Sequence, residues 1–136
     1  MSPFQLKEWK MGNKIIFTPN APAPIGPYSQ AIDTGGLIFI SGQIPLDPQS
    51  GAVVGSTIKE QAKQALNNIK EILVSQSLDT TALVKTTVFI RSMTDFPAFN
   101  AVYEESLNGW KPARSVVEAS GLPKNVLVEI EAIACR

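Results

Sequence analysis

The chain has 136 residues, a length typical of one domain that buries about two-thirds of its unfolded surface. Its 12 basic and 12 acidic residues leave no net charge, which argues against a nucleic-acid partner, because general nucleic-acid binders carry a basic stripe. The absence of histidine excludes the serine–histidine and cysteine–histidine nucleophiles and the commonest metal ligand, and a single cysteine excludes structural zinc.

Targeting signals are not evident in the sequence. No apolar run reaches the roughly 18 residues of a membrane span, and the first segment carries charged residues such as Lys7 and Glu8 where a signal peptide needs an apolar core. The lone Cys135 cannot close an internal disulfide, which suits a reducing compartment. We therefore expect a cytoplasmic protein, with a mitochondrial destination left open, built from an N-terminal extension, residues 1–13, and one domain, residues 14–136.

The first third of the domain predicts strands around a rigid loop. Residues 15–17 form a short strand candidate, and the prolines of the following segment, APAPIGPYSQA, favour an extended loop. Residues 29–33 and 37–41 then predict a β-hairpin that turns at two glycines. Tyr28 ends the loop, where it is either a hydrogen-bonding wall of a pocket or a tyrosine at the edge of the core.

A polar loop and a long helix come next. Residues 41–55 read SGQIPLDPQSGAVVG, and in this loop Gly42 either lets the backbone approach a ligand closely or simply serves turn geometry. Apolar residues then recur at spacings of three and four through residues 57–76, which predicts an amphipathic helix lying on a sheet.

A strand and a second helix follow. Residues 83–90 predict a strand with Val84, Val88 and Ile90 on one face. A helix capped by Thr94 or Asp95 then turns its apolar residues inward and stops near residues 108–109. We expect Asn100 to lie on this helix away from its apolar stripe.

The last quarter of the chain predicts two strands, residues 114–119 and 126–134, joined as a hairpin-like unit. In the second strand, alternation places Glu129 and Glu131 on the face opposite the apolar residues. Arg114 could reach these carboxylates across the sheet or across a subunit boundary, an arrangement that suits a small anionic substrate. The alternative is that Arg114 and Glu129 are ordinary solvated sheet residues.

The order of elements predicts an α+β fold, a mixed sheet with two helices on one face. The other face of the sheet would remain bare, although it carries apolar side chains beside its charges. Exposed apolar patches of this kind usually mark interfaces, so we expect a homo-oligomer.

Several strings resemble the RidA (YjgF) family: APAPIGPYSQA, FISGQIPLDP, VKTTVFI, DFPAFNAVYEE and PARSVVEASGLPKNVLVEIEA. Their order and spacing match over residues 14–135. The resemblance implies a chorismate-mutase-like fold and a homotrimer with a central β-barrel and ligand clefts between subunits. It also implies hydrolysis of 2-imino acids, such as 2-iminobutanoate and 2-iminopropanoate, to 2-oxo acids and ammonia, without a metal or organic cofactor.

The resemblance also assigns roles to individual residues. Arg114 would bind the substrate carboxylate, which fits a planar guanidinium that donates two parallel hydrogen bonds, and Glu129 would position or activate water. The remaining cleft residues would be Tyr28, Ser41, Gly42 and Asn100. The chain departs from the family pattern at Val116, where many relatives have cysteine, so a role for a thiol there is in doubt.

Two other functions stay open at this point. A trimer could bind small acids, or act as a chaperone, without catalysis. Relatives have also been described as ribonucleases or translation inhibitors, but a chain without net charge or histidine offers little with which to build a nuclease.

Overall fold

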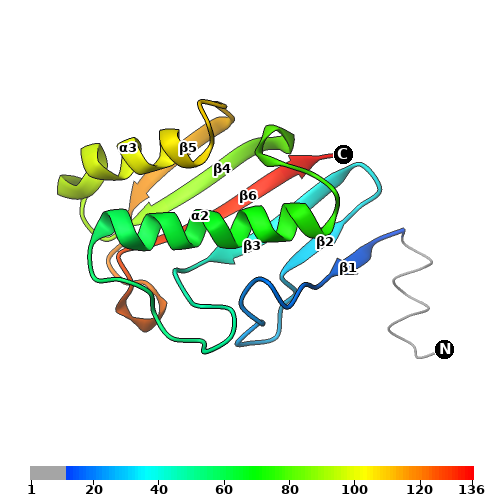
Figure 1. The fold of residues 1–136 in the computed structure, drawn as a ribbon, viewed down its shortest axis with the longest axis horizontal. Coiled ribbons are helices and arrows are strands. Elements are labelled where there is room, and N and C mark those ends of the chain that lie inside the picture. The colour runs from blue at the N-terminus through cyan, green and yellow to red at the C-terminus, as the bar shows by residue number, and fades with distance from the viewer. Residues whose placement is uncertain (1–11) are drawn as a thin grey trace.

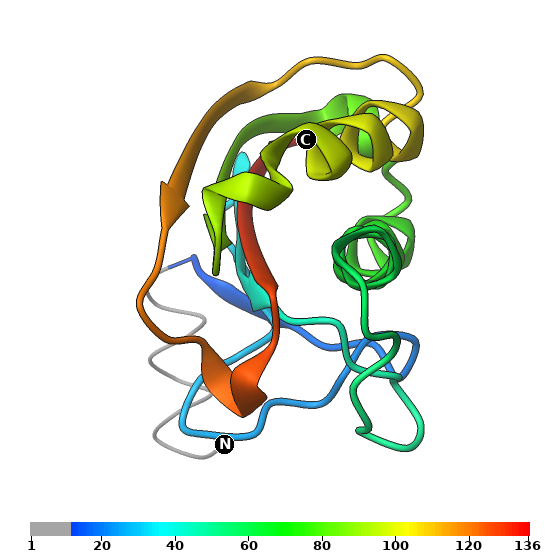
Figure 2. The same cartoon turned by 90° about the vertical axis from the view of Figure 1, so that its left-hand side faces the viewer.

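The computed structural model describes residues 12–136, so residues 1–11 of the expected N-terminal extension lie outside the described residues. One mixed sheet has the strand order β1-β2-β3-β6-β4-β5, and two long helices, α2 and α3, cover one of its faces (Figure 1). Seen along the sheet edge, both helices lie on the same side, as the sequence predicted (Figure 2). The strands and helices are β1 Lys14–Ile16, β2 Ala31–Asp33, β3 Leu37–Gln43, α2 Ile58–Ser75, β4 Leu83–Ile90, α3 Phe96–Ser106, β5 Ala113–Glu118 and β6 Val128–Cys135.

The predicted long helix is α2, and its first turn explains where it begins. The Glu60 amide donates to Thr57 Oγ1 at 3.2 Å, and the Thr57 amide donates to Glu60 Oε1 at 3.2 Å, which makes a reciprocal capping box. Its apolar side chains then face the sheet. No helix between residues 12 and 136 is long and apolar enough to cross a membrane.

The predicted hairpin of residues 29–33 and 37–41 is confirmed as β2 and β3, which pair antiparallel. The predicted unit at the C-terminal end is wrong in its pairing. β5 lies parallel to β4, and β6 lies antiparallel on the other side of β4, so the two C-terminal strands do not touch as a hairpin. The cause is α3, because a helical crossover after β4 returns the chain parallel to it.

The face assignment of β4 needs one correction. We predicted that Val84 would share the core face with Val88 and Ile90, but Val84 is 43% exposed and Leu83 is buried instead. The pairing with β6 shifts in register between Leu83 and Lys85. A bulge of this kind offsets the alternation by one residue, which strict period-two reading cannot anticipate.

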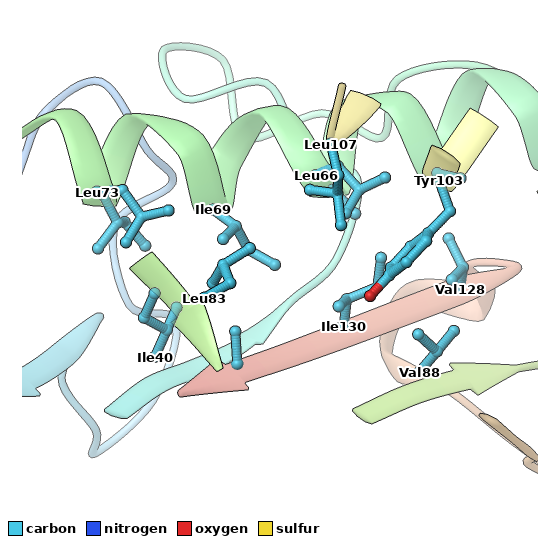
Figure 3. Packing of buried hydrophobic residues seen from close by; sticks show 14 of the residues in the cluster. Ile40, Leu66, Ile69, Leu73, Leu83, Val88, Tyr103, Leu107, Val128 and Ile130 are labelled. Carbon is cyan, nitrogen blue, oxygen red and sulfur yellow. The ribbon is translucent and has the colours of Figure 1, made fainter. Parts of the chain in front are cut away.

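The core lies between the helices and the sheet (Figure 3). In β6, Val128 and Ile130 point into it, as predicted, while the alternate residues face the other side. No helix of the described residues packs on that other face, and Leu37, Phe39 and Val117 are 40%, 45% and 46% exposed. This uncovered apolar face is the feature from which we expected an oligomer.

Arg136 ties three segments together. Its amide donates to the Gly36 carbonyl at 2.9 Å, and its guanidinium pairs with Asp33 at 2.8 Å and also contacts Gln76, at the end of α2. The pKa of Asp33 is lowered, first by the hydrogen bond from the Gly35 amide and then by Arg136. The ionised carboxylate is therefore the form that the folded chain stabilises.

Asp33→Asn should lower the melting temperature at neutral pH and have little effect in strong acid. A carboxyl with a depressed folded-state pKa contributes stability above its unfolded pKa, about 3.9, and loses it as the pH falls through the folded value. Thermal unfolding of both proteins between pH 7 and pH 2 measures this. A gap in melting temperature that stays constant over this range would contradict the carboxylate's role.

Candidate functional site

Arg114 lies against one face of α3. Phe96, Asn100 and Tyr103 are spaced by four and three residues, so they share that face. Arg114 Nη1 donates to Asn100 Oδ1 at 2.9 Å, and Arg114 Cζ lies 4.8 Å from the centroid of the Tyr103 ring and 5.6 Å from that of Phe96. Our expectation that Asn100 would lie away from the apolar stripe is wrong, because it lies beside that stripe and is partly buried.

Tyr103 is itself anchored. It is 7% exposed, and its hydroxyl hydrogen-bonds with Thr86 Oγ1, in the middle of β4, at 2.7 Å. Burial raises the pKa of Tyr103, while the Thr86 hydroxyl and the positive charge of Arg114 oppose that rise. A neutral phenol at physiological pH therefore presents its ring to the guanidinium.

A hollow of about 460 Å³ opens beside Arg114. Its walls come from α3, from the start of β5 and from the segment between them, and its lining residues are Asn100, Tyr103, Glu104, Trp110, Lys111, Pro112 and Arg114. Trp110 Nε1 donates to the Leu83 carbonyl at 2.9 Å, which fixes that wall. The hollow is large enough for a small acid.

Glu129 lies on the uncovered face of the sheet. Along β6 it alternates with the buried Val128 and Ile130, and it is only partly exposed. A Cβ at Gly42 would lie 2.5 Å from Glu129 Oε2, so the close approach of β3 requires glycine there. Burial raises the pKa of Glu129, and the neighbouring Glu131 carboxylate raises it further.

Ser41 and Tyr28 hold the loop before β2. The Ser41 hydroxyl donates to the Ser29 carbonyl at 2.6 Å, and the Ser41 amide donates to the Gln30 carbonyl at 2.9 Å. Tyr28 is 47% exposed, and its hydroxyl accepts from the Ile25 amide at 3.2 Å. In one copy of the chain, Tyr28 is therefore a partly exposed residue whose hydroxyl closes its own loop.

The predicted site residues form two groups. Arg114 contacts Asn100 on the helix-covered face, and Glu129 contacts Gly42 on the uncovered face. β4 separates β5 from β6, and within the sheet Arg114 pairs with the buried Thr86. The prediction that Arg114 could reach Glu129 across its own sheet is therefore wrong, since the side chains leave the sheet on opposite sides.

Sequence reasoning missed Tyr103 and Phe96 as partners of Arg114, although their spacing from Asn100 was a usable signal. Val116, the position where relatives carry cysteine, packs against the core. In the described part of the chain, no three acidic, histidine or cysteine side chains lie close enough to hold a metal ion.

Comparison with known proteins decides the family. The family model described as endoribonuclease L-PSP matches residues 18–136. The chain belongs to this family, which is the RidA family. A RutC family protein of Pyrococcus horikoshii is 53% identical over 89% of this chain and 96% of its own length. A Salmonella typhimurium relative, 49% identical over 91% of this chain and 98% of its own, is named 2-iminobutanoate/2-iminopropanoate deaminase.

Solved structures of RidA relatives confirm the fold. The structure of Escherichia coli TdcF with bound serine superposes with a TM-score of 0.86 and 44% identity, and it covers 90% of this chain and 98% of TdcF. The mixed six-stranded sheet with two helices is thus the chorismate-mutase-like fold that the family resemblance implied.

Glu131→Gln should lower the pKa of Glu129, because the like charge two residues along the same face is removed. Carbon-detected NMR titration of the glutamate side chains would report this pKa in both proteins. Glu105→Gln, on the exposed side of α3, is the matched control and should leave the Glu129 titration in place. An unchanged Glu129 pKa in Glu131→Gln would remove Glu131 as a cause.

Proposed function

We propose that this chain hydrolyses small 2-imino acids to 2-oxo acids and ammonia, in the cytoplasm and without a cofactor. The observation that carries the proposal is the guanidinium of Arg114, which is held by Asn100 and two aromatic rings at the edge of a hollow. The deaminase name of a relative 49% identical over 91% of the chain supports the reaction. The serine bound to TdcF, an amino acid with a carboxylate, supports the substrate class.

Arg114 binds the substrate carboxylate. Among residues 12–136, the guanidinium donates one hydrogen bond, from Nη1 to Asn100. The remaining N–H groups can donate a pair of parallel, charge-assisted hydrogen bonds to a carboxylate. Because the protein already holds the guanidinium, little side-chain freedom is lost when substrate binds.

Glu129 acts on water. A carboxylate whose pKa is raised by burial exchanges protons more readily near neutral pH than an exposed glutamate does. Glu129 takes a proton from water as the oxygen adds to the carbon of the protonated imine, which gives a neutral carbinolamine. It returns this proton to nitrogen and then takes the hydroxyl proton as the C–N bond breaks, so that ammonia leaves as the ketone forms. Glu129 finally releases that proton to ammonia or solvent. Water is the only co-reactant, so the reaction itself calls for no metal or organic cofactor.

The complete site lies between copies of the chain. Since Arg114 and Glu129 leave one sheet on opposite sides, the two can meet only when Glu129 comes from a neighbouring copy. The uncovered sheet face, with Leu37, Phe39 and Val117 exposed, supplies the apolar surface for that contact. We propose a homotrimer whose sheets form an inner barrel, with Tyr28, Ser41 and Gly42 beside Glu129 at each cleft.

Two non-deaminase functions remain as outcomes of the tests. The family description names an endoribonuclease, whose activity would appear as RNA cleavage by the purified protein. A trimer that only binds small acids, or unfolded clients, would hydrolyse no imine. The absence of net charge and of histidine argues against the nuclease.

Arg114→Lys should lose most of its activity on freshly generated 2-iminopropanoate while its melting temperature stays near that of the wild type. Lysine keeps the charge and lacks the planar fork.

Glu129→Gln should lower kcat more than it raises KM, because it removes a proton carrier and keeps the shape of the side chain. The rate of ammonia release measures the activity of the wild type, Arg114→Lys and Glu129→Gln. The control variant, Glu131→Gln, should have a kcat within a few-fold of the wild-type value. If Glu129→Gln were active and Glu131→Gln inactive, the proposed assignment of catalysis to Glu129 would be wrong, and Glu131 would be the catalytic carboxylate.

A mixing experiment tests whether the site is shared. Arg114→Ala and Glu129→Gln should each be inactive alone. After co-refolding in equal amounts, about a quarter of the sites should combine an intact Arg114 from one chain with an intact Glu129 from the next. Recovery of about a quarter of wild-type activity, together with a trimer mass by light scattering, is expected. No recovery in mixed oligomers would contradict the shared site.

A further inference from the structure

We infer that Tyr103 is a positioning residue for Arg114, and that Thr86 fixes Tyr103 in that role. This inference rests on the proposed function, in which Arg114 binds the substrate carboxylate. Tyr103 touches no reacting atom in this scheme. Its effect passes through the guanidinium whose direction it sets.

The contacts form a closed triangle. Thr86 on β4 pairs with Arg114 on β5 in the register of the sheet. The Thr86 hydroxyl hydrogen-bonds with the Tyr103 hydroxyl at 2.7 Å, and the Tyr103 ring lies 4.8 Å from Arg114 Cζ. Each side of the triangle is a different kind of contact, so the position of the guanidinium is fixed relative to its own strand.

The aromatic ring and the amide of Asn100 restrain different motions. Asn100 accepts from Nη1 and directs one edge of the guanidinium. A ring close to Cζ attracts the delocalised charge over the centre of the group and limits how far it swings. The Phe96 ring, 5.6 Å away, adds a second, longer contact. An arginine held in this way keeps its guanidinium in place among the residues that line the hollow.

Packing in the core accounts for the ring of Tyr103 but not for its hydroxyl. Phe99, one turn earlier on α3, fills the core without any polar atom and is fully buried. At position 103 a buried phenol is paired with a fully buried threonine hydroxyl. Apolar residues could pack at both positions, so the paired hydroxyls mark a requirement for direction rather than for packing.

Tyr103→Leu should raise KM for 2-iminopropanoate about tenfold with kcat changed less than threefold, because the stacked guanidinium loses its ring. Tyr103→Phe keeps the ring but loses the hydrogen bond to Thr86, so its KM should lie between those of the wild type and Tyr103→Leu. The matched control is Phe99→Leu, which removes a buried ring 5.5 Å from the Tyr103 ring without touching Arg114. It should lower the melting temperature and leave KM near the wild-type value.

A second measurement needs no substrate. Relaxation of the Arg114 side-chain ¹⁵Nε signal, identified by its loss in Arg114→Lys, should report a rigid guanidinium in wild type and Phe99→Leu and a mobile one in Tyr103→Leu. An unchanged signal and KM in Tyr103→Leu, or equal changes in Phe99→Leu, would overturn the inference. If the wild type hydrolyses no imine, the proposed function fails, and the relaxation data still decide whether Tyr103 positions Arg114.

Discussion

The alternation of side chains along a strand is the constraint on which the rest of this structure depends. Arg114 lies on β5 and Glu129 lies on β6. Because side chains alternate along each strand, these two side chains point to opposite sides of the same sheet. No rotamer change brings the two together within a chain. A site that uses both groups, as in the proposed function, must therefore lie between copies of the chain, and the uncovered sheet face would then belong both to that site and to the proposed assembly.

The two halves of the site are prepared by different physical means. Arg114 is oriented by neutral partners, an amide and aromatic rings, which hold the cation without neutralising it. Glu129 is tuned by burial and by a like charge, which favour its protonated form. A fixed cation and a carboxyl group that can take up and return a proton are together what the proposed addition of water to an imino acid requires.

Local patterns predicted the elements well, and the long-range arrangement less well. The helical periodicity located α2 to within a residue at each end, and alternation assigned the faces of β6. The pairing of β5 with β4 was missed, because two strands close in sequence look like a hairpin until the helical crossover before β5 is considered. The partners of Arg114 were missed because the contact joins a helix to a strand. Spacing could show that Tyr103 shares a helix face with Asn100, but only the folded sheet supplies the register that brings Thr86, Tyr103 and Arg114 together.

The uncovered face of the sheet also sets a condition on the newly made chain. A chain that has not yet joined the proposed oligomer exposes Phe39 and Val117 by almost half of their surface. Encounter between copies depends on their concentration, whereas the helix-covered core forms within one molecule. At low expression, chains would spend longer as lone subunits, open to proteases and to chaperones that recognise apolar strands. The abundance of the protein would then depend on how fast it is synthesised as well as on how stably it folds.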